Sequence, residues 1–141
     1  MVSIKRIAAL MFLFVPLLAT AQLKGHERIV AQVPFKFMVG DVTVPAGQIS
    51  VQLANEKVGV LSVENRDAGQ SVFAFTAFSE AKANANAPEF VFRRYGDNWF
   101  LAGLKIDGSR TVYEFRESKL EKELRAQNLP ASEEVLLASA R

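Results

Sequence analysis

Residues 89–107 read EFVFRRYGDNWFLAGLKID, and this stretch decides the fold. Two runs rich in apolar and aromatic residues, 89–95 and 99–107, flank the short segment 96–98. Gly96 and Asn98 tolerate the positive φ angles that tight hairpins require. The stretch therefore predicts a β-hairpin. Asp107 and Gly108 mark a second hairpin that leads into residues 111–115.

Similar runs of Val, Ile, Phe and Thr recur along the chain, with turn residues between them at intervals of about 8 to 12 positions. The clearest of these runs cover residues 29–39, 48–54, 58–65 and 71–78. This spacing predicts an all-β domain, namely a small antiparallel β-barrel or sandwich of about seven strands. A short C-terminal helix should follow it.

Phenylalanine side chains indicate where the core lies. Of the 11 phenylalanines, Phe12 and Phe14 belong to the apolar N-terminal run, and nine follow it. Residues 71–78 are apolar on both faces, which is typical of a central strand. Strand alternation places seven of the nine on one face of the sheet, namely Phe35, Phe37, Phe73, Phe75, Phe90, Phe92 and Phe100.

The N-terminus has the features of an export signal. Lys5 and Arg6 precede an apolar run at residues 7–18, and Ala19 and Ala21 supply small side chains before a peptidase site. We expect cleavage after Ala21 and a periplasmic or secreted mature protein. Because the apolar run is shorter than the roughly 17 residues that span a bilayer, we expect no stable membrane insertion after cleavage.

The expected organisation has four parts: a signal peptide at 1–21, an N-terminal segment at 22–28, a β domain at 29–117, and a helix with its tail at 118–141. The helix should begin at Ser118, because Ser118 and Glu121 match a capping box. Its charged side chains are typical of a solvated face. Pro130 ends the helix, and residues 131–141 fit a short edge strand, a helical turn or a frayed tail.

Composition excludes several classes of function. The chain has no cysteine and a single histidine, His26, which excludes disulfides, thiolate chemistry and multi-histidine zinc sites. Without Lys5 and Arg6 the mature chain has 15 basic and 15 acidic residues, which gives no reason to expect a nucleic acid partner. No phosphate-binding or calcium-binding loop motif is present, so we expect no metal and no cofactor.

Catalytic chemistry has no supporting pattern. His26 precedes the first expected strand, away from any nucleophile that it could activate. The acids fall in turns or at strand ends, and the sequence brings no pair of them to the separation that a glycosidase needs. These acids are Glu80, Glu89, Asp97, Asp107 and Glu114. We therefore predict that the protein is not an enzyme and has no catalytic residue.

Arg94 is the most informative charged residue. It shares its strand face with Phe90 and Phe92, which would direct its guanidinium to the interior or to the mouth of a barrel. A charge that has lost its water requires a partner. Arg94 therefore forms either a structural ion pair, with Glu114 as the expected partner, or the anchor of an anionic ligand.

Three segments together carry a resemblance: VPFKF at 33–37 with PAG at 45–47, FRRYGD at 92–97, and the helix start at 118–124. They resemble a family of small, exported, uncharacterised proteins seen especially in soil-dwelling acidobacteria. The chain departs from that pattern at Lys36, where the family often has an acid, and at Ile49, where it often has an aromatic residue. The resemblance implies export and a compact domain, and it implies no activity, cofactor or site residue.

These observations favour an exported, non-enzymatic β domain that binds a protein or a cell-envelope component. The alternative is a lipocalin-like carrier of a small apolar ligand, which many inward phenylalanines disfavour because side chains just fill a barrel of about eight strands. An outer-membrane barrel is also disfavoured. Its strands need about nine residues or more, and here the outward faces carry Lys36, Gln52, Glu64 and Lys105.

Overall fold

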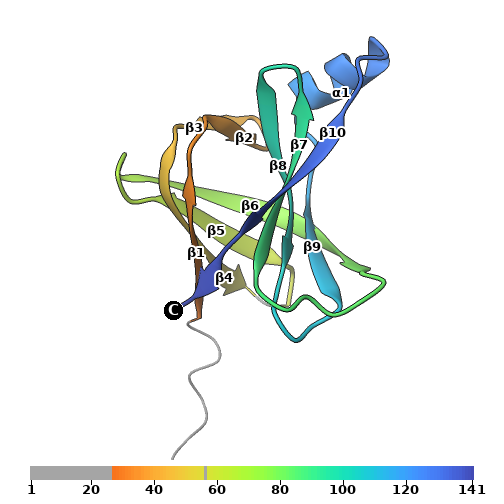
Figure 1. The fold of residues 1–141 in the computed structure, drawn as a ribbon. Coiled ribbons are helices and arrows are strands. Elements are labelled where there is room, and N and C mark those ends of the chain that lie inside the picture. Colours follow the sequence, from red (N-terminus) through yellow and green to blue (C-terminus); the bar gives the residue numbers. More distant parts are fainter. Residues whose placement is uncertain (1–26, 56) are drawn as a thin grey trace, which may run out of the picture.

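The structure is a computed structural model that describes residues 27–55 and 57–141 (Figure 1). The expected signal peptide and His26 lie outside the described residues. No helix among the described residues is long and apolar enough to cross a bilayer. The strands are β1 (Arg28–Val33), β2 (Phe37–Val39), β3 (Val42–Val44), β4 (Gly47–Asn55), β5 (Val60–Asn65), β6 (Gln70–Glu80), β7 (Glu89–Tyr95), β8 (Asn98–Lys105), β9 (Thr111–Phe115), β10 (Ser132–Leu137) and β11 (Ser139–Ala140), and the helix is α1 (Lys119–Ala126).

The fold is mostly β with one short C-terminal helix, as the sequence predicts. The expected barrel or sandwich of about seven strands is not confirmed, because the strands form an open eleven-stranded sheet. Two features raise the number of strands. Pro34, which has no N–H to donate, separates β1 from β2 in the run at residues 29–39. The C-terminal tail, whose structure the sequence left open, forms β10 and β11.

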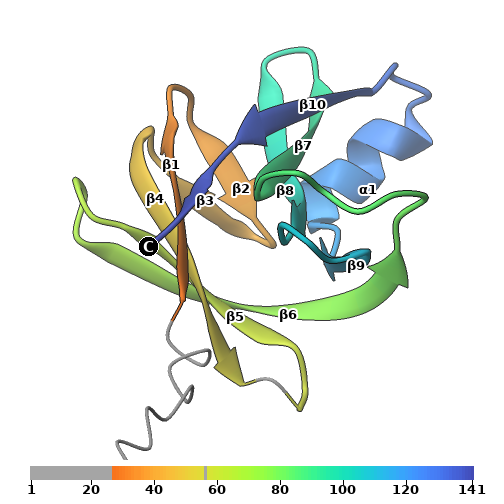
Figure 2. The same cartoon turned by 60° about the horizontal axis from the view of Figure 1, so that its bottom comes forward.

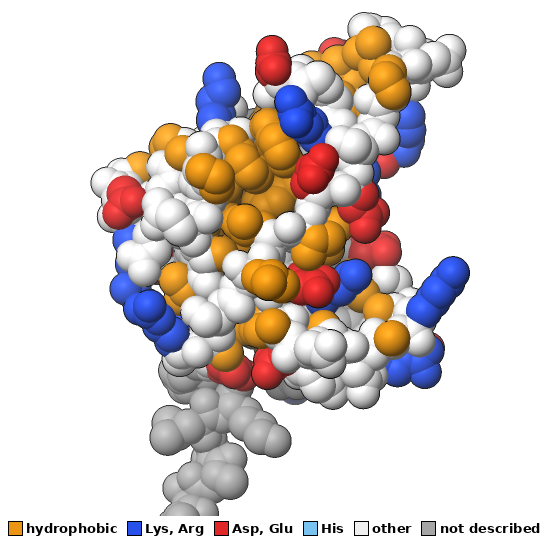
Figure 3. Space-filling view, in the orientation of Figure 1, with side chains coloured by type: hydrophobic (Ala, Val, Ile, Leu, Met, Phe, Trp, Pro, Cys, Tyr) orange, Lys and Arg blue, Asp and Glu red, His pale blue; other side chains and the backbone are white. Residues whose placement is uncertain are grey.

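The sheet folds back on itself around β6. The first half of β6 pairs with β5 and the second half pairs with β9, so this strand joins the β1–β4–β5 group to the β7–β8–β9 group (Figure 2). On the other side, β10 pairs with β7 and β11 pairs with β1. Only Ala138 separates β10 from β11. The C-terminal segment therefore lies against both ends of the sheet, and hydrophobic side chains gather beside it (Figure 3).

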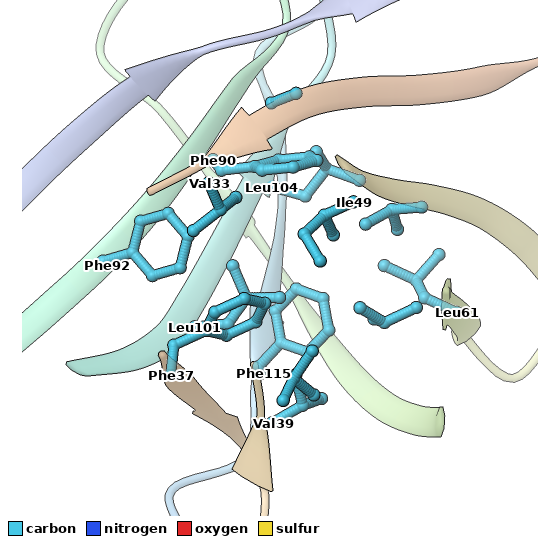
Figure 4. Packing of buried hydrophobic residues seen from close by; sticks show 14 of the residues in the cluster. Val33, Phe37, Val39, Ile49, Leu61, Phe90, Phe92, Leu101, Leu104 and Phe115 are labelled. Carbon is cyan, nitrogen blue, oxygen red and sulfur yellow. The ribbon is translucent and has the colours of Figure 1, made fainter. Parts of the chain in front are cut away.

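The hydrophobic core lies between these two groups of strands (Figure 4). Phe37, Phe90 and Phe92 are almost fully buried in it, and the rings of Phe37 and Phe92 meet edge to face with centroids 5.3 Å apart. Ile49 and Val51 of β4 also point inward, as alternation predicts. Aromatic rings that interlock in this way fill the space between the strands.

The prediction that Phe73 and Phe75 point into the core is wrong. Their side chains are 69% and 62% exposed, respectively, and Val72 and Ala74 pack against the core in their place. Both faces of β6 are apolar, so alternation alone could not select the inward one. The small inner side chains fit a core that larger rings from other strands already fill.

A β-bulge changes which residues of β8 face the core. The β7–β8 register shifts between Val91 and Phe92, so that Ala102 of β8 has no partner in the ladder. Beyond the bulge Leu101 faces the core, whereas Phe100 was expected to do so. Phe100 is buried on the opposite face of the hairpin, where its ring packs edge to face with Tyr95 at 5.8 Å.

Helix α1 begins as the capping pattern predicts. The Glu121 backbone N–H donates to the Ser118 Oγ at 3.0 Å, which satisfies a free amide of the first turn. The helix is not solvated all round, however, because Glu121 is buried. Its carboxylate also has a different partner from the one that a capping box supplies, as the next subsection describes.

Candidate functional site

The outer face of β6 and of its neighbours is the candidate site. Alternate residues of β6 point away from the core. Toward one end, Phe73 and Phe75 pair with Ser62 and Val60 of β5. Toward the other end, residues of β6 pair with β9, and the sheet continues through β8 to β7. We call this surface the outer face, with an aromatic end at Phe73 and Phe75 and a polar end at Ser79, Val91, Gly103, Val112 and Glu114.

The aromatic end exposes two large rings side by side on one strand. Burying a phenylalanine side chain is worth roughly 1.5 to 3 kcal/mol, so leaving two of them in water forgoes a substantial stabilisation. The rings border a groove of about 270 Å³ between β6 and the turn from β2 to β3, where Arg116 supplies a cation. Exposed apolar surface that adjoins polar groups is typical of a binding surface.

The polar end contains a groove of about 570 Å³. Val91, Gly103 and Val112 lie at its floor on β7, β8 and β9. Gly103 has no side chain, and a Cβ placed there would lie 3.5 Å from Val112 Cγ1. The missing side chain hollows the sheet surface at this point. Residues 81–85, which follow β6, border the groove.

Charged groups in pairs surround this groove. Lys105 Nζ lies 3.6 Å from Glu89 Oε2, and Arg110 Nη1 lies 3.4 Å from Glu80 Oε1. The Ser79 Oγ donates to Glu114 Oε1 at 2.8 Å. Three acids that the sequence placed at turns or strand ends, Glu80, Glu89 and Glu114, thus line one groove. Each has an ionic or hydrogen-bonded partner, which holds its carboxylate in place.

A buried ion pair fixes one side of the groove. Arg93, which lines the groove, donates from Nε to the Glu121 carboxylate of α1. The Glu121 side chain is only 2% exposed, whereas that of Arg93 is 32% exposed. Burial opposes the charged form of Arg93, but the hydrogen bond and the charge of Glu121 outweigh it and raise the pKa of Arg93. The pair therefore ties α1 to β7 and holds a cation at the groove.

The hydroxyl of Tyr95 responds to the same carboxylate. Burial raises the pKa of Tyr95, and the negative charge of Glu121 raises it further. Both effects disfavour the tyrosinate. Tyr95 therefore stays neutral in the folded protein over a wider pH range than a free tyrosine does.

The structure does not bring Arg94 and Glu114 together. Arg94 is exposed, donates from Nε to the Gly96 carbonyl oxygen at 2.6 Å, and lies 4.9 Å from the centroid of the Trp99 ring. Glu114 is instead the partner of Ser79. The expected strand face of Arg94 is correct, because Trp99, its partner in the ladder, packs against the core. β7 extends past the core at that point, so Arg94 reaches solvent rather than the interior.

Sequence reasoning missed Arg93, Glu121 and Gly103. Arg93 lies on the face opposite Arg94, and its partner comes from α1, which strand alternation cannot place. Glu121 was assigned to the capping box. Gly103 did give a signal, because a glycine inside a strand often marks a close approach or a hollow in the surface.

Across residues 27–55 and 57–141, no group of three or more His, Cys, Asp or Glu residues is arranged to hold a metal ion. Comparison with known proteins finds no family model, no curated protein and no solved structure that matches the chain. The chemistry of the outer face is therefore the basis for a proposed function.

Proposed function

We propose that this chain is an exported, non-enzymatic β domain that binds a protein or a cell-envelope component through its outer face. The observation that carries the proposal is the exposed pair Phe73 and Phe75 on β6. Protein interfaces enrich aromatic residues at their centre and surround them with polar groups. The paired charges at the polar end of the same face supply such a rim.

The filled core disfavours the alternative function, carriage of a small apolar ligand. Phe37, Phe90 and Phe92 occupy the space between the two groups of strands, where such a ligand would have to lie. A carrier needs an interior volume that its own side chains leave empty. The exposed rings of β6 instead offer apolar surface on the outside, which suits a macromolecular partner.

The chemistry of the groove also favours binding over catalysis. The Ser79 hydroxyl lies in the groove and donates a hydrogen bond to the Glu114 carboxylate. A carboxylate is a weak base toward a serine hydroxyl, and activated serines depend on a stronger base such as histidine. Of the other acids that line the groove, Glu80 and Glu89 are engaged by Arg110 and Lys105, and Glu133 lies on β10.

Co-purification from the native envelope tests the proposal. Phe73→Ser with Phe75→Ser should fold normally and lose the components that the wild-type protein retains. The matched control is Val58→Ser with Leu129→Ser, which removes two exposed apolar side chains that line neither groove (56% and 44% exposed). Mass spectrometry should find the same components with the control as with the wild type. Unchanged components with the β6 double variant would disprove binding through this face.

An activity screen tests the non-enzymatic part of the proposal. Purified mature protein should hydrolyse esterase, glycosidase, phosphatase and peptidase substrates at the rate of the buffer alone. Ser79→Ala and Glu114→Ala should change none of these rates. Reproducible turnover that either variant abolishes would replace the binding module with an enzyme whose site is the groove.

A further inference from the structure

The C-terminal segment uses alternate residues to pair with two different strands. The Ala138 N–H donates to the Pro88 carbonyl oxygen at 2.8 Å, in step with the β10–β7 register. At the end of the chain, Arg28 and Arg141 exchange backbone hydrogen bonds of 3.1 and 2.8 Å, in step with the β1–β11 register. In an antiparallel ladder the bonded residues alternate. Even-numbered residues of the segment therefore face β7, and odd-numbered residues face β1.

Within residues 27–55 and 57–141, three odd-numbered residues of the segment have no strand to pair with. The pairing of β1 with the end of the chain covers Arg28, Ile29 and Val30, and β10 is an end of the sheet path. The backbone N–H and C=O groups of Glu133, Val135 and Leu137 thus point away from β7 and have no ladder partner there. By the same alternation, the backbone of Gln32 in β1 faces the same gap. We call this gap the seam; it is closed by pairing at residues 28–30 and open along β10.

Apolar side chains lie next to the part of β7 that pairs with β10: Phe35 contacts Phe92, the ladder partner of Glu134, with ring centroids 5.0 Å apart. Phe35, Trp99 and Leu136 are partly buried and pack against the core. The rings of Phe35 and Trp99 stack with centroids 3.8 Å apart. Figure 3 shows hydrophobic side chains gathered between the β1–β3 side of the molecule and β10. A strand laid along β10 would therefore find apolar surface under one of its faces.

The edge of β10 is acidic. Glu133 and Glu134 are both exposed, and neither belongs to an ion pair within the described residues. Glu134 accepts only a long hydrogen bond of 3.4 Å from Ser132 Oγ. Charges on an edge strand discourage pairing with a strand of the same charge. The edge therefore disfavours a second copy of β10 and favours a strand that carries basic side chains.

We propose that the seam binds an extended strand of a partner protein in which basic and apolar side chains alternate. The backbone of this strand pairs with Glu133 and Val135, as in other cases of strand addition to an exposed edge. Its apolar side chains cover Phe35 and Trp99, and its basic side chains lie near the acids of β10. The added strand bridges the two ends of the sheet and closes it. Glu133 also lines the groove at the polar end of the outer face, but Glu134 and Val135 do not. The variants of Val135 therefore test the seam, whereas those of Phe73 and Phe75 test the outer face.

Amide hydrogen exchange of the full mature protein tests the seam directly. In the free protein, the amides of Glu134 and Leu136 should exchange slowly because they donate to β7, whereas those of Glu133 and Val135 should exchange fast. The probe is a peptide of about six residues in which lysine and valine alternate. Its binding should slow exchange at Glu133 and Val135 and leave the rates at Glu134 and Leu136 nearly unchanged.

Two sets of variants make the test specific. Val135→Pro removes an N–H that the β10–β7 ladder does not use, so it should fold and bind the peptide at least about tenfold more weakly, whereas Val135→Ala should bind it normally. A peptide with glutamate in place of lysine should also bind at least about tenfold more weakly. Glu133→Lys with Glu134→Lys should reverse this preference, which keeps the test decisive if the proline variant fails to fold.

Several results would overturn the proposal. The first is equal binding of the lysine peptide by the wild type and Val135→Pro. The second is a preference for lysine that the double variant Glu133→Lys with Glu134→Lys leaves intact. The third is that the peptide does not slow amide exchange at Glu133 and Val135. A dimer that forms with concentration and that Val135→Pro abolishes would assign the seam to a second copy instead. None of these results depends on Phe73 or Phe75, so they leave the proposed function to its own test.

Discussion

β6 and β7 carry the same aromatic pattern and use it in opposite ways. Phe73 and Phe75 stand two positions apart on β6, as Phe90 and Phe92 do on β7. The β7 pair is about 1% exposed, whereas the β6 rings are mostly in solvent. Hydrophobicity and alternation are alike in the two strands, so neither property explains the difference.

The neighbouring strands explain it. Phe90 and Phe92 lie opposite Leu104 and Leu101 of β8, which face the core. On β6, Val72 faces the core and lies opposite Val63 of β5. Phe73 points to the outer face and lies opposite Ser62. Alternation thus defines two faces of a strand, and the cross-strand partners decide which face is buried.

The largest effect we expect separates these two pairs of rings. Phe92→Ala should lower the free energy of unfolding by about 3 to 5 kcal/mol, because it leaves a cavity among buried rings. Phe75→Ala removes a ring that is largely in solvent, and substitutions at such positions usually change stability by about 0.5 kcal/mol or less. Denaturant midpoints of the purified variants measure the difference.

Phe90→Ala and Phe73→Ala repeat the comparison at the neighbouring positions. The first should resemble Phe92→Ala and the second should resemble Phe75→Ala. Equal midpoints for the β6 and β7 variants would mean that both strands bury their rings, and that the outer face of β6 is covered in solution.

The β6–β7 contrast also shows how much the sequence could predict. The strand runs, the hairpin at Gly96 and the helix start at Ser118 follow from local patterns, and all of them are present. The inward face of β6 did not follow, because both of its faces are apolar. The shift at Ala102 did not follow either, because a bulge depends on how two strands meet.

The candidate site was harder to predict than the fold because its members come from separate elements. Arg93 and Glu121 are 28 positions apart in the chain and meet only because α1 packs near the β7–β8 hairpin. Strand parity was sufficient to place Arg94 on the aromatic face. It could not indicate that the hairpin extends past the core there.

The second largest effect should come from the buried ion pair on β7, for which β6 has no counterpart. Removing one partner of a buried pair costs about 3 to 5 kcal/mol, and the partial exposure of Arg93 should reduce this to about 1 to 3 kcal/mol. Glu121→Gln and Arg93→Met should each lower the unfolding free energy by that amount.

The double variant of Arg93 and Glu121 should lower the unfolding free energy by less than the sum of the single variants. Each single variant leaves the other side chain charged but without its counter-ion, and the double variant removes both charges. Chemical denaturation of the four proteins supplies the thermodynamic cycle. Effects that add strictly would mean that the two side chains do not interact in solution.

A smaller effect should appear at alkaline pH through Tyr95, on the same side of the hairpin. Its raised pKa means that folding favours the neutral phenol. The resulting stabilisation is complete below the ordinary tyrosine pKa of about 10 and is lost as the pH rises through the higher pKa of the folded state. Tyr95→Phe should therefore lose less stability than the wild type between about pH 9 and about pH 12. Parallel losses in the two proteins would contradict the shift.

The smallest effect should come from Arg94 and Glu114, which the sequence paired and the structure separates. Arg94 makes a cation–π contact with Trp99 at an exposed site, which is worth roughly 0.5 to 1 kcal/mol, and a hydrogen bond to the Gly96 carbonyl oxygen. Glu114 loses only its hydrogen bond with Ser79 when it becomes alanine. Side chains without a shared partner have effects that add to within about 0.5 kcal/mol, so the double variant should equal the sum of the single variants. The cycle at Arg93 and Glu121 should deviate from additivity in the same denaturant series, which makes it the internal positive control. A deviation at Arg94 and Glu114 of comparable size would mean that these two side chains interact in solution, and that the end of the β7–β8 hairpin lies closer to β9 than the structure places it.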